Sequence, residues 1–498
     1  MNVMQKNQTP DSRTSEIFEV SGLAVDTSVD NVDALHYRPE FQTTGKPRKK
    51  AISAIAIRLC TEESDIKHSM HAEAGKIIDE SILQQTMRAL EAEGKSHTIE
   101  YELAKYRLDT RQLLYLAARI NDPETPTEQI QGWTDAFTDK SIEIWGKPDE
   151  KFATDLLREQ MVELSALADS HPHEYRELLS AASALGLPTE VEQSDAPSYR
   201  ERFKKVADQV GEYMKRKYGA VFDALDLDQF NDREMTAADM ADAVERGIAE
   251  LAKTNPVWST WQVIRDEEKA QFNVEGSDFT ITVGMKRNSA TREEFQALFA
   301  HEVLRHAMAA TNGSLLDYEL QKGLPEYLSW EEAVGVLKEY ALTGIMPEKI
   351  VNRYIDISVA LGDLTDNGRQ PRRALQRFAM AREKLRNAAL PMDKQSTDAT
   401  IEKDVKTHIN RIYRGTLGDD EHVGVMTKDY VYMGGLPEVC QYIEDELAAG
   451  KTIDEIMEYI DSGKFNPTKQ SNRDYVESKK HNRFKELVPV GHKTRQDI

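Results

Sequence analysis

The chain has 498 residues and a formal net charge of −22 at pH 7, with 40% hydrophobic and 30% charged residues. This length allows about three domains, and the composition argues against global disorder. The excess of acid repels phosphate backbones, so we expect neither a nucleic-acid partner nor binding to an anionic membrane surface. No apolar run reaches the roughly 18 residues of a membrane helix, and we expect no transmembrane segment.

The N-terminal sequence and the cysteine content both indicate a cytoplasmic protein. The opening stretch MNVMQKNQTPDSRTSE lacks the basic and then apolar pattern of a signal peptide. Two cysteines, Cys60 and Cys440, cannot form a disulfide framework or a zinc knuckle. We therefore expect a reducing, cytoplasmic setting, and the sequence leaves the oligomeric state open.

The first half of the chain predicts helices. Residues 1–47 are rich in Thr, Ser, Asp and Asn without a sustained period, which is typical of a flexible leader. Residues 48–255 predict a mainly helical N-terminal region, because apolar residues recur three and four positions apart in segments such as TRQLLYLAARI and KFATDLLREQMVELSALA. The stretch GLPTEVEQSDAPS interrupts this pattern and is typical of a linker between two helical groups.

The period changes after Pro256, where we assign residues 256–463 to a catalytic core. TWQVIRD, QFNVEG and DFTITVG predict three strands, and helical periods then return up to about residue 390. TKDYVYMGG predicts a further strand and turn, and PEVCQYIEDELAAG predicts a closing helix that ends before Gly450. Residues 464–498 are basic and predict a disordered tail, with an arm for an acidic partner as the alternative. The expected fold is α+β and predominantly helical, with a small sheet and an N-terminal helical layer.

The segment TREEFQALFAHEVLRHAMAATNG contains a histidine motif on a predicted helix. Thr291 and Glu294 form a capping box at its start, and Asn312-Gly313 is a stop signal at its end. The motif itself is a histidine followed directly by a glutamate, with a second histidine four residues after that glutamate. This spacing is one residue longer than the HExxH zinc signature.

The two histidines, His301 and His306, share a metal ion only if the helix is distorted. Five positions correspond to about 140° around a regular α-helix, so the two rings point in different directions. A one-residue π-bulge or a local unwinding brings such positions together, and π-bulges are frequent at functional sites. We predict that distortion here; the alternative is a regular helix with two unrelated histidines.

The next predicted helix, in KGLPEYLSWEEAVGVLKEYA, begins near Ser329 and carries Glu331 and Glu332 in its first turn. A mononuclear zinc site needs two histidines, a third ligand and an open position for water, and the third ligand is commonly a Glu from a following helix. Glu332 has an alternative role in a capping box with Ser329. Glu331 has one as a surface acid that favours the helix N-terminus. The spacing alone leaves these roles open.

Three ordered blocks, HEVLRHAMAATNG, GLPEYLSWEEAVGVL and RIYRGTLGDDEHVGVMTKDYVYMGG, together resemble the tyrosine carboxypeptidase family. Its bacterial members are called flavohaemoglobin expression-modulating QEGLA-motif proteins, and its animal members remove the C-terminal tyrosine of α-tubulin. The likeness extends from about residue 279 to 435. It implies a zincin-like metallopeptidase core in which His301, His306 and Glu332 bind Zn²⁺ and Glu302 is the catalytic base.

The sequence departs from that family pattern at three places. Ala333-Val334-Gly335 stands where the pattern has Gly-Leu-Ala, Leu304-Arg305 replaces a pair of small residues, and Ala309 occupies a position that is often Arg. The first change is conservative. The other two alter side chains near the metal helix and bear on substrate preference, but none of the three changes a proposed ligand.

A carboxypeptidase must also hold the terminal carboxylate of its substrate, and the guanidinium of arginine binds carboxylates bidentately. The candidates in the last block are Arg411 and Arg414, supported by Lys428, Tyr430 and Tyr432. The DFTITVG strand precedes the metal helix as the edge strand does in zincins. It is either a strand that holds an extended peptide or an ordinary sheet strand.

The resemblance implies a zinc metallocarboxypeptidase that removes an aromatic or acidic C-terminal residue from a peptide or protein. In such an enzyme the metal polarises the scissile carbonyl, and a glutamate takes the proton of the attacking water. One alternative is a non-catalytic regulatory protein that retains the zincin fold and acts through protein contacts. Another is an aminopeptidase or endopeptidase, which differs in the peptide end that the site accepts.

Overall fold

The structure is a computed structural model that describes residues 80–96, 98–121, 125–190, 198–365, 367–417 and 421–487. The expected leader, Cys60 and most of the expected linker lie outside these residues. Contacts divide the chain into two compact units. The first comprises Met1–Ser96, Ala104–Ala196 and Lys349–Tyr430, and the second comprises His97–Leu103, Pro197–Glu348 and Val431–Ile498. Neither unit coincides with a predicted domain, because the chain leaves the first unit after Ala196 and returns to it at Lys349.

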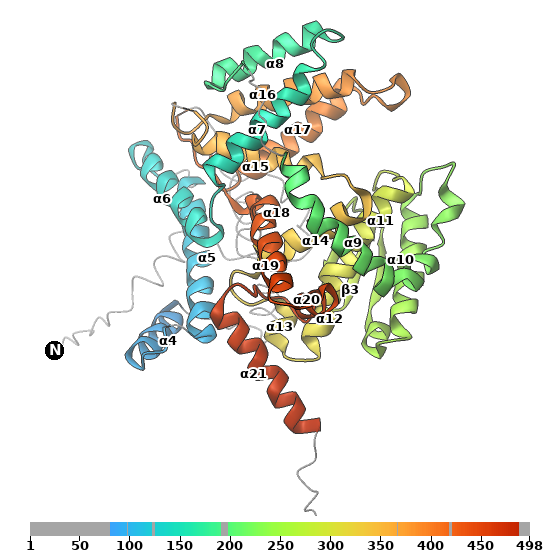
Figure 1. The fold of residues 1–498 in the computed structure, drawn as a ribbon. Helices are drawn as coiled ribbons and strands as arrows, with labels where there is room; N and C mark the ends of the chain where they lie inside the picture. The colour runs from blue at the N-terminus through green and yellow to red at the C-terminus, as the bar shows by residue number, and fades with distance from the viewer. Residues whose placement is uncertain are drawn as a thin grey trace, which may run out of the picture. The chain divides into compact units, whose positions relative to one another are not determined.

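The described residues form an α+β fold that is predominantly helical with one three-stranded sheet, as the sequence predicts (Figure 1). None of the described helices combines the length and the apolar character needed to cross a membrane.

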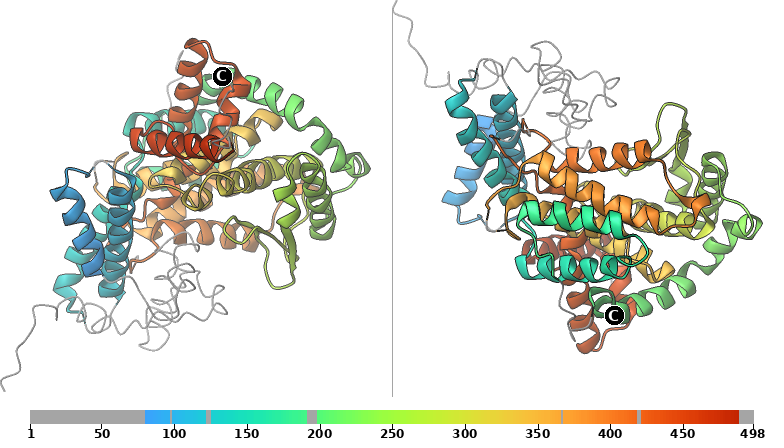
Figure 2. Two further views of the ribbon diagram at one scale, coloured as in Figure 1. Left: turned by 90° about the horizontal axis from the view of Figure 1, so that it is seen from below. Right: turned by 90° about the horizontal axis from the view of Figure 1, so that it is seen from above.

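The first unit is all-helical in its described part. Its helices are α4(Glu80–Ala92), most of α5(Ile99–Asn121), α6(Thr127–Trp145), α7(Glu150–Ser165), α8(Pro172–Leu185), α15(Glu348–Leu361), α16(Arg372–Ala388) and α17(Asp398–Ile412), with the short turns η6(Met392–Lys394) and η7(Lys428–Tyr430). Helix α16 packs against both α8 and α17, and Figure 2 shows these three helices side by side. Leu375 and Phe378 of α16 are fully buried there. On the same face of α16, one turn after Phe378, Arg382 donates to both carboxylate oxygens of the buried Asp356 at 2.9 and 2.7 Å.

The second unit contains the sheet and the predicted histidine helix. Its elements in chain order are α9(Tyr199–Ala224), η3(Leu227–Phe230), α10(Ala237–Ala252), η4(Pro256–Thr260), β1(Gln262–Asp266), β2(Phe272–Glu275), β3(Thr280–Gly284), α11(Arg292–His301), η5(Glu302–Ala307), α12(Met308–Ser314), α13(Tyr318–Lys322), α14(Tyr327–Thr343), α18(Val431–Gly434), α19(Leu436–Ala448), α20(Ile453–Ile460) and α21(Gln470–Leu487).

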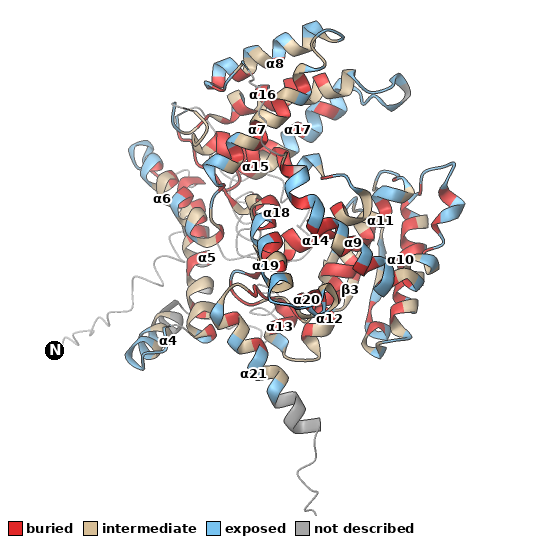
Figure 3. Ribbon diagram, viewed as in Figure 1, coloured by how far each residue is buried: buried red, intermediate tan, exposed pale blue. Residues whose placement is uncertain are grey.

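Helix α14 lies at the centre of the second unit. It contacts α9, α11, η5, α18 and α19, and Figure 3 shows it as largely buried. Its approach to α9 is close because α9 has a glycine there: a Cβ added to Gly211 would lie 2.7 Å from the carbonyl oxygen of Ala341. A helix that is surrounded on most sides buries apolar residues around its circumference rather than along one stripe.

The three predicted strands after Pro256 are confirmed. Strand β3 lies in the middle of the sheet, parallel to β1 and antiparallel to β2. The expectation that DFTITVG is an edge strand is therefore wrong. Its alternating Ile281 and Val283 are fully buried, and backbone partners occupy both of its edges. The strand that packs beside η5 is β2, which is at the edge of the sheet.

The predicted strand in TKDYVYMGG is also wrong, because this segment forms the helical turns η7 and α18. Val431 and Met433 are buried two positions apart, which is the spacing of a strand face. Over so few residues that spacing does not exclude a helical turn. The helix α19 that follows is confirmed, although α20 and α21 come after it, so it does not close the fold.

The predicted disordered tail is wrong for its first part. Phe465 and Val476 are buried in a cluster with Ile99, Leu320 and Leu324, and residues 470–487 form α21. Lys479 and Tyr475 of α21 both bind Asp317, at 2.6 and 2.8 Å. Because the segment is predominantly basic, its sequence did not indicate that a few apolar residues pack it against the rest of the second unit. Residues 488–498 lie outside the described part of the chain.

Candidate metal centre

The histidine motif lies on a helix that changes its winding within the motif. Thr291 is the N-cap residue of α11, and its side chain and that of Glu294 form the predicted capping box. After His301 the helix becomes the π-helical turn η5, and it returns to an α-helix in α12. The N–H of Met308 bonds to the carbonyl of Val303, five residues earlier. The distortion that the five-residue spacing requires is therefore confirmed.

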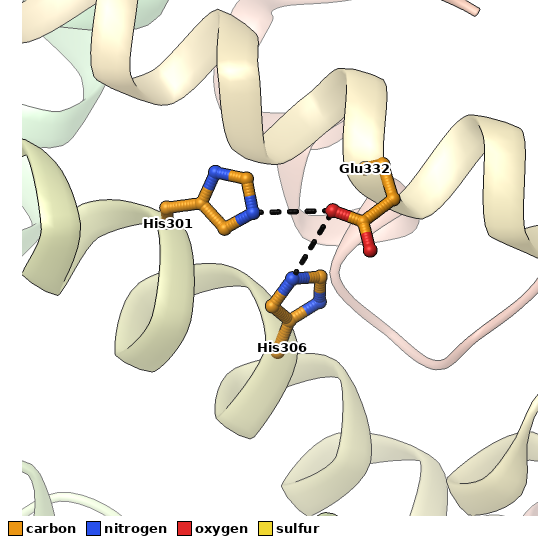
Figure 4. Close-up of side chains that lie close together, drawn as sticks. All are labelled: His301, His306 and Glu332. Atoms are coloured by element: carbon orange, nitrogen blue, oxygen red, sulfur yellow. Dashed lines mark hydrogen bonds and ion pairs between the residues drawn. The ribbon is translucent and has the colours of Figure 1, made fainter. Parts of the chain in front are cut away.

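The π turn brings His301 and His306 together with Glu332 of α14 (Figure 4). Oε2 of Glu332 lies 3.3 Å from Nε2 of His301 and 3.6 Å from Nε2 of His306, and the candidate ligand atoms all lie within 4.8 Å of one another. A four-coordinate zinc with bonds of about 2.0–2.1 Å spaces its ligand atoms about 3.3 Å apart. The group therefore fits one zinc ion after a small closure between the two rings.

Both alternative roles for the adjacent glutamates are wrong. Helix α14 begins at Tyr327 with Glu326 as its N-cap residue, so Ser329 lies inside the helix and caps nothing. Glu331 is not a surface acid, because only 1% of its side chain is exposed. Glu332 remains the residue that faces both Nε2 atoms.

The second nitrogen of each imidazole faces another carboxylate. Nδ1 of His306 lies 2.8 Å from Oε1 of Glu331, and Nδ1 of His301 lies 2.5 Å from Oε1 of Glu339, without the alignment of a good hydrogen bond. A carboxylate on the far nitrogen fixes the ring and its tautomer, and is the usual support of a metal-binding histidine. Glu339 was not predicted from the sequence, although its seven-residue spacing from Glu332 places both on one face of a helix.

These contacts shift the pKa values of the group in opposite directions. Burial disfavours the charged form of His306, but Glu332 and Glu331 outweigh it and raise the pKa of His306 to about 9. Burial likewise opposes the charge on Glu331, but Arg305, Lys464 and His306 lower its pKa to about 2. Burial opposes the charge on His301, but Glu332 and Glu339 raise its pKa. Burial also opposes the charge on Glu332, but His306 and then His301 lower its pKa. The imidazoles thus favour their protonated forms and the glutamates their ionised forms, and a bound cation would replace the protons on the ring nitrogens that bind it.

Glu302 lies beside this group but is not part of its hydrogen bonds. Burial raises the pKa of Glu302, and the two neighbouring imidazoles, His306 and His301, oppose that shift. Among the described residues none forms a hydrogen bond or ion pair with its carboxylate. The side chain is therefore placed next to the candidate ligands with its oxygens available to another molecule.

A buried cluster of charges lies behind the candidate ligands. Arg305 is fully buried and contacts Glu331 at 3.2 Å and Asp461 at 3.0 Å. Lys338, also fully buried, contacts Asp461 at 2.8 Å. Arg305, which departs from the family pattern together with Leu304, is therefore a member of this buried cluster and does not point to solvent. Sequence periodicity gave no sign of it, because its members come from three separate helical segments.

Tyr432 and the candidate ligands belong to the second unit, whereas four of the five predicted substrate-binding residues, Arg411, Arg414, Lys428 and Tyr430, belong to the first. Both Nε and Nη2 of Arg411 donate to the buried Asp429, so an internal carboxylate occupies its guanidinium. Arg414 is buried and acts electrostatically on the same Asp429. Lys428 begins η7, and the ring of Tyr430 lies 6.1 Å from that of Tyr354. These four residues thus take part in contacts within the first unit.

An arginine that was not predicted from the sequence as a site residue lies in the second unit. Arg287 is in the connection between β3 and α11 and is partly buried. Burial lowers the pKa of its guanidinium, while the charges of Glu302 and Glu294 oppose that shift. Its side chain has no hydrogen bond or ion pair with any described residue. A single arginine in a turn carries no sequence signal by which it could have been found.

Comparison with known proteins gives no match: no family model, no curated protein and no solved structure is significantly similar to this chain. The fold and the site together define a mostly helical α+β protein with a candidate metal centre of two histidines and one glutamate.

Proposed function

We propose that this protein is a zinc-dependent carboxypeptidase that removes an aromatic or acidic residue from the C-terminus of a peptide or protein. The observation that carries the proposal is the convergence of His301, His306 and Glu332, with a carboxylate on the far nitrogen of each ring. Two imidazoles and one carboxylate are a common ligand set of catalytic zinc, and they leave a fourth position for water.

The residues around the three ligands supply what hydrolysis needs. Bound zinc acts as a Lewis acid and lowers the pKa of its water towards about 7. Glu302 accepts the proton of the attacking water at its carboxylate and delivers it to the leaving amine. The raised pKa of Glu302 supports that role, since a general base works best when its pKa lies near the working pH. A residue that only held the fold would not need an unpaired carboxylate at this position.

Two features of the second unit support a peptide C-terminus as the substrate. Strand β2 is at the sheet edge beside η5, where an extended peptide can pair with it. Arg287 is a partly buried cation that has no hydrogen-bond or ion-pair partner in the described part of the chain, and Glu302 is the first of the two acids whose charges act on it. An arginine in that role matches the carboxylate of a C-terminus rather than the amine of an N-terminus. The sheet, the metal helix and the glutamate helix together support a zincin-like core.

The test is hydrolysis of peptides that end in Tyr, Phe or Glu, followed by mass spectrometry. We expect the zinc-loaded protein to release the last residue only, and Glu302→Gln to release none while it keeps its zinc. Peptides with an amidated C-terminus should be poor substrates. Internal cleavage or release of the first residue would identify an endopeptidase or aminopeptidase. Bound zinc without any hydrolysis would favour the regulatory alternative.

A further inference from the structure

The π turn leaves one backbone carbonyl of the metal helix without its usual partner. In a regular α-helix the carbonyl of Leu304 would accept the N–H of Met308, four residues later. Here that N–H bonds to the carbonyls of Val303 and Arg305 instead. Leu304 is fully buried, and a buried carbonyl without a hydrogen-bond partner is destabilising. The distortion that joins the histidines therefore needs a donor from elsewhere.

Lys338 of α14 supplies that donor. Its Nζ lies 2.7 Å from the carbonyl oxygen of Leu304. The same ammonium contacts both oxygens of Asp461, at 2.9 and 2.8 Å, and Asp461 in turn accepts from Arg305 at 3.0 Å. Lys338 has no exposed surface, although lysine is among the residues that are least often buried. Its position is explained by the carbonyl that it satisfies.

We propose that Lys338 is a positioning residue of the metal centre: it stabilises the π turn, and through that turn it holds His301 and His306 in reach of one ion. This inference rests on the proposed zinc site. Without the lysine the favourable way to satisfy the Leu304 carbonyl is the regular α-helical bond from Met308. That change of winding removes the extra residue from the turn and rotates His306 by about 100° away from His301.

Helix α14 would then contribute to the metal centre in two ways. Glu332, in its second turn, is the candidate third ligand, and Lys338, six residues later, fixes the helix that carries the other two. Any movement of α14 relative to η5 therefore changes the ligand and the winding of the histidine helix together.

The test compares Lys338→Met with wild type in zinc affinity, by competition with a chromophoric chelator, and in the visible spectrum of the Co²⁺-substituted protein. We expect about 10- to 100-fold weaker zinc binding, as for other supporting residues of metal sites. We also expect loss of the intense four-coordinate Co²⁺ bands. Lys338→Arg keeps a donor for the carbonyl and should retain most of the affinity and the spectrum.

The matched control is Asp461→Asn, which alters the same buried cluster but leaves Lys338 and the Leu304 carbonyl in place. It should lower the melting temperature while zinc affinity and the Co²⁺ spectrum stay close to wild type. Wild-type affinity and spectrum in Lys338→Met would overturn the inference. Loss of affinity and of the four-coordinate Co²⁺ spectrum in Lys338→Arg would also overturn it, and that result decides even if Lys338→Met does not fold. A wild type that binds no zinc would instead overturn the proposed metal site itself.

Discussion

Nδ1 of His306 lies 2.8 Å from Glu331, and Nε2 of the same ring lies 3.6 Å from Glu332. Two adjacent residues of α14 thus contact opposite nitrogens of one imidazole. Glu331 is buried and shared with Arg305, whereas the side chain of Glu332 is 13% exposed and faces both rings. We infer that the first glutamate orients the histidine and the second binds the metal.

Glu331→Gln and Glu332→Gln should therefore behave differently. Glu331→Gln leaves the buried Arg305 without one of its two acidic partners, which should lower the free energy of unfolding by about 3–5 kcal/mol. It should weaken zinc binding by about 10- to 100-fold without abolishing it. Glu332→Gln should lose stoichiometric zinc. Urea unfolding and chelator competition measure both effects, and the reverse pattern would assign the ligand role to Glu331.

Arg287→Ala should reduce kcat/KM for peptides with a free C-terminus by about 10- to 100-fold, because a hydrogen bond to a charged group contributes about 1.5–3 kcal/mol. The remaining turnover of amidated peptides should not change. Arg265→Ala is the matched control, since Arg265 lies in the same unit and pairs with Asp242 and Glu245 on the surface. Equal losses on free and amidated peptides would show that Arg287 has a structural role instead.

Gly335→Ala should disturb the metal centre directly. A Cβ at this position would lie 2.8 Å from both Cε1 and Nδ1 of His301. Because α14 and α11 are packed together, we expect the ring to move and zinc affinity to fall about tenfold. Gly219→Ala in α9 is the control, since nothing lies within 4 Å of its added Cβ. The control should keep wild-type zinc affinity and gain about 0.5–1 kcal/mol of stability.

The family motif that this segment resembles has alanine at the position of Gly335. Unchanged zinc affinity in Gly335→Ala would mean that the His301 ring is less confined than the structure shows.

The first unit should lose stability in acid through Asp356. Burial disfavours its charge, but Arg382 and His408 outweigh that effect and lower the pKa of Asp356 to about 2. An unfolded aspartate has a pKa of about 3.9, so the native contacts favour the ionised form and contribute about 2–3 kcal/mol above pH 4. That contribution is lost as the pH falls from about 4 towards 2. The protection factors for amide hydrogen exchange in α15 and α16, which are corrected for the intrinsic rate at each pH, should fall over this range.

Asp356→Asn provides the comparison for this pH dependence. It should exchange faster than wild type at pH 6, and the difference should shrink as the pH falls below 4. A difference that stays constant down to pH 2.5 would contradict the assignment to this carboxylate.

The sequence predicted those parts of the site that follow from spacing along one helix. Because His301 and His306 are five positions apart, only a distorted helix brings them together, and the π turn is the distortion found. The strands after Pro256 were predictable because their apolar residues alternate over several positions. The capping box of Thr291 was predictable because it is a local hydrogen-bond pattern.

The supporting residues were not predictable, because they depend on contacts between separate segments. Lys338, Arg305 and Asp461 read individually as surface charges, and only the packing of α14, η5 and α20 buries them together. Arg411 was a reasonable candidate for substrate binding until the structure showed Asp429 against its guanidinium. Pairing on both edges of β3 likewise depends on two other strands.

The most direct test of the proposed metal site is the zinc content of the purified protein, measured by mass spectrometry beside Glu332→Ala and Glu302→Gln. We predict one zinc per chain in the wild type and in Glu302→Gln, because Glu302 is not a proposed ligand. We predict none in Glu332→Ala, which lacks the third ligand. A wild type without zinc after supply of the metal would rule out the proposed site, as would full zinc occupancy in Glu332→Ala.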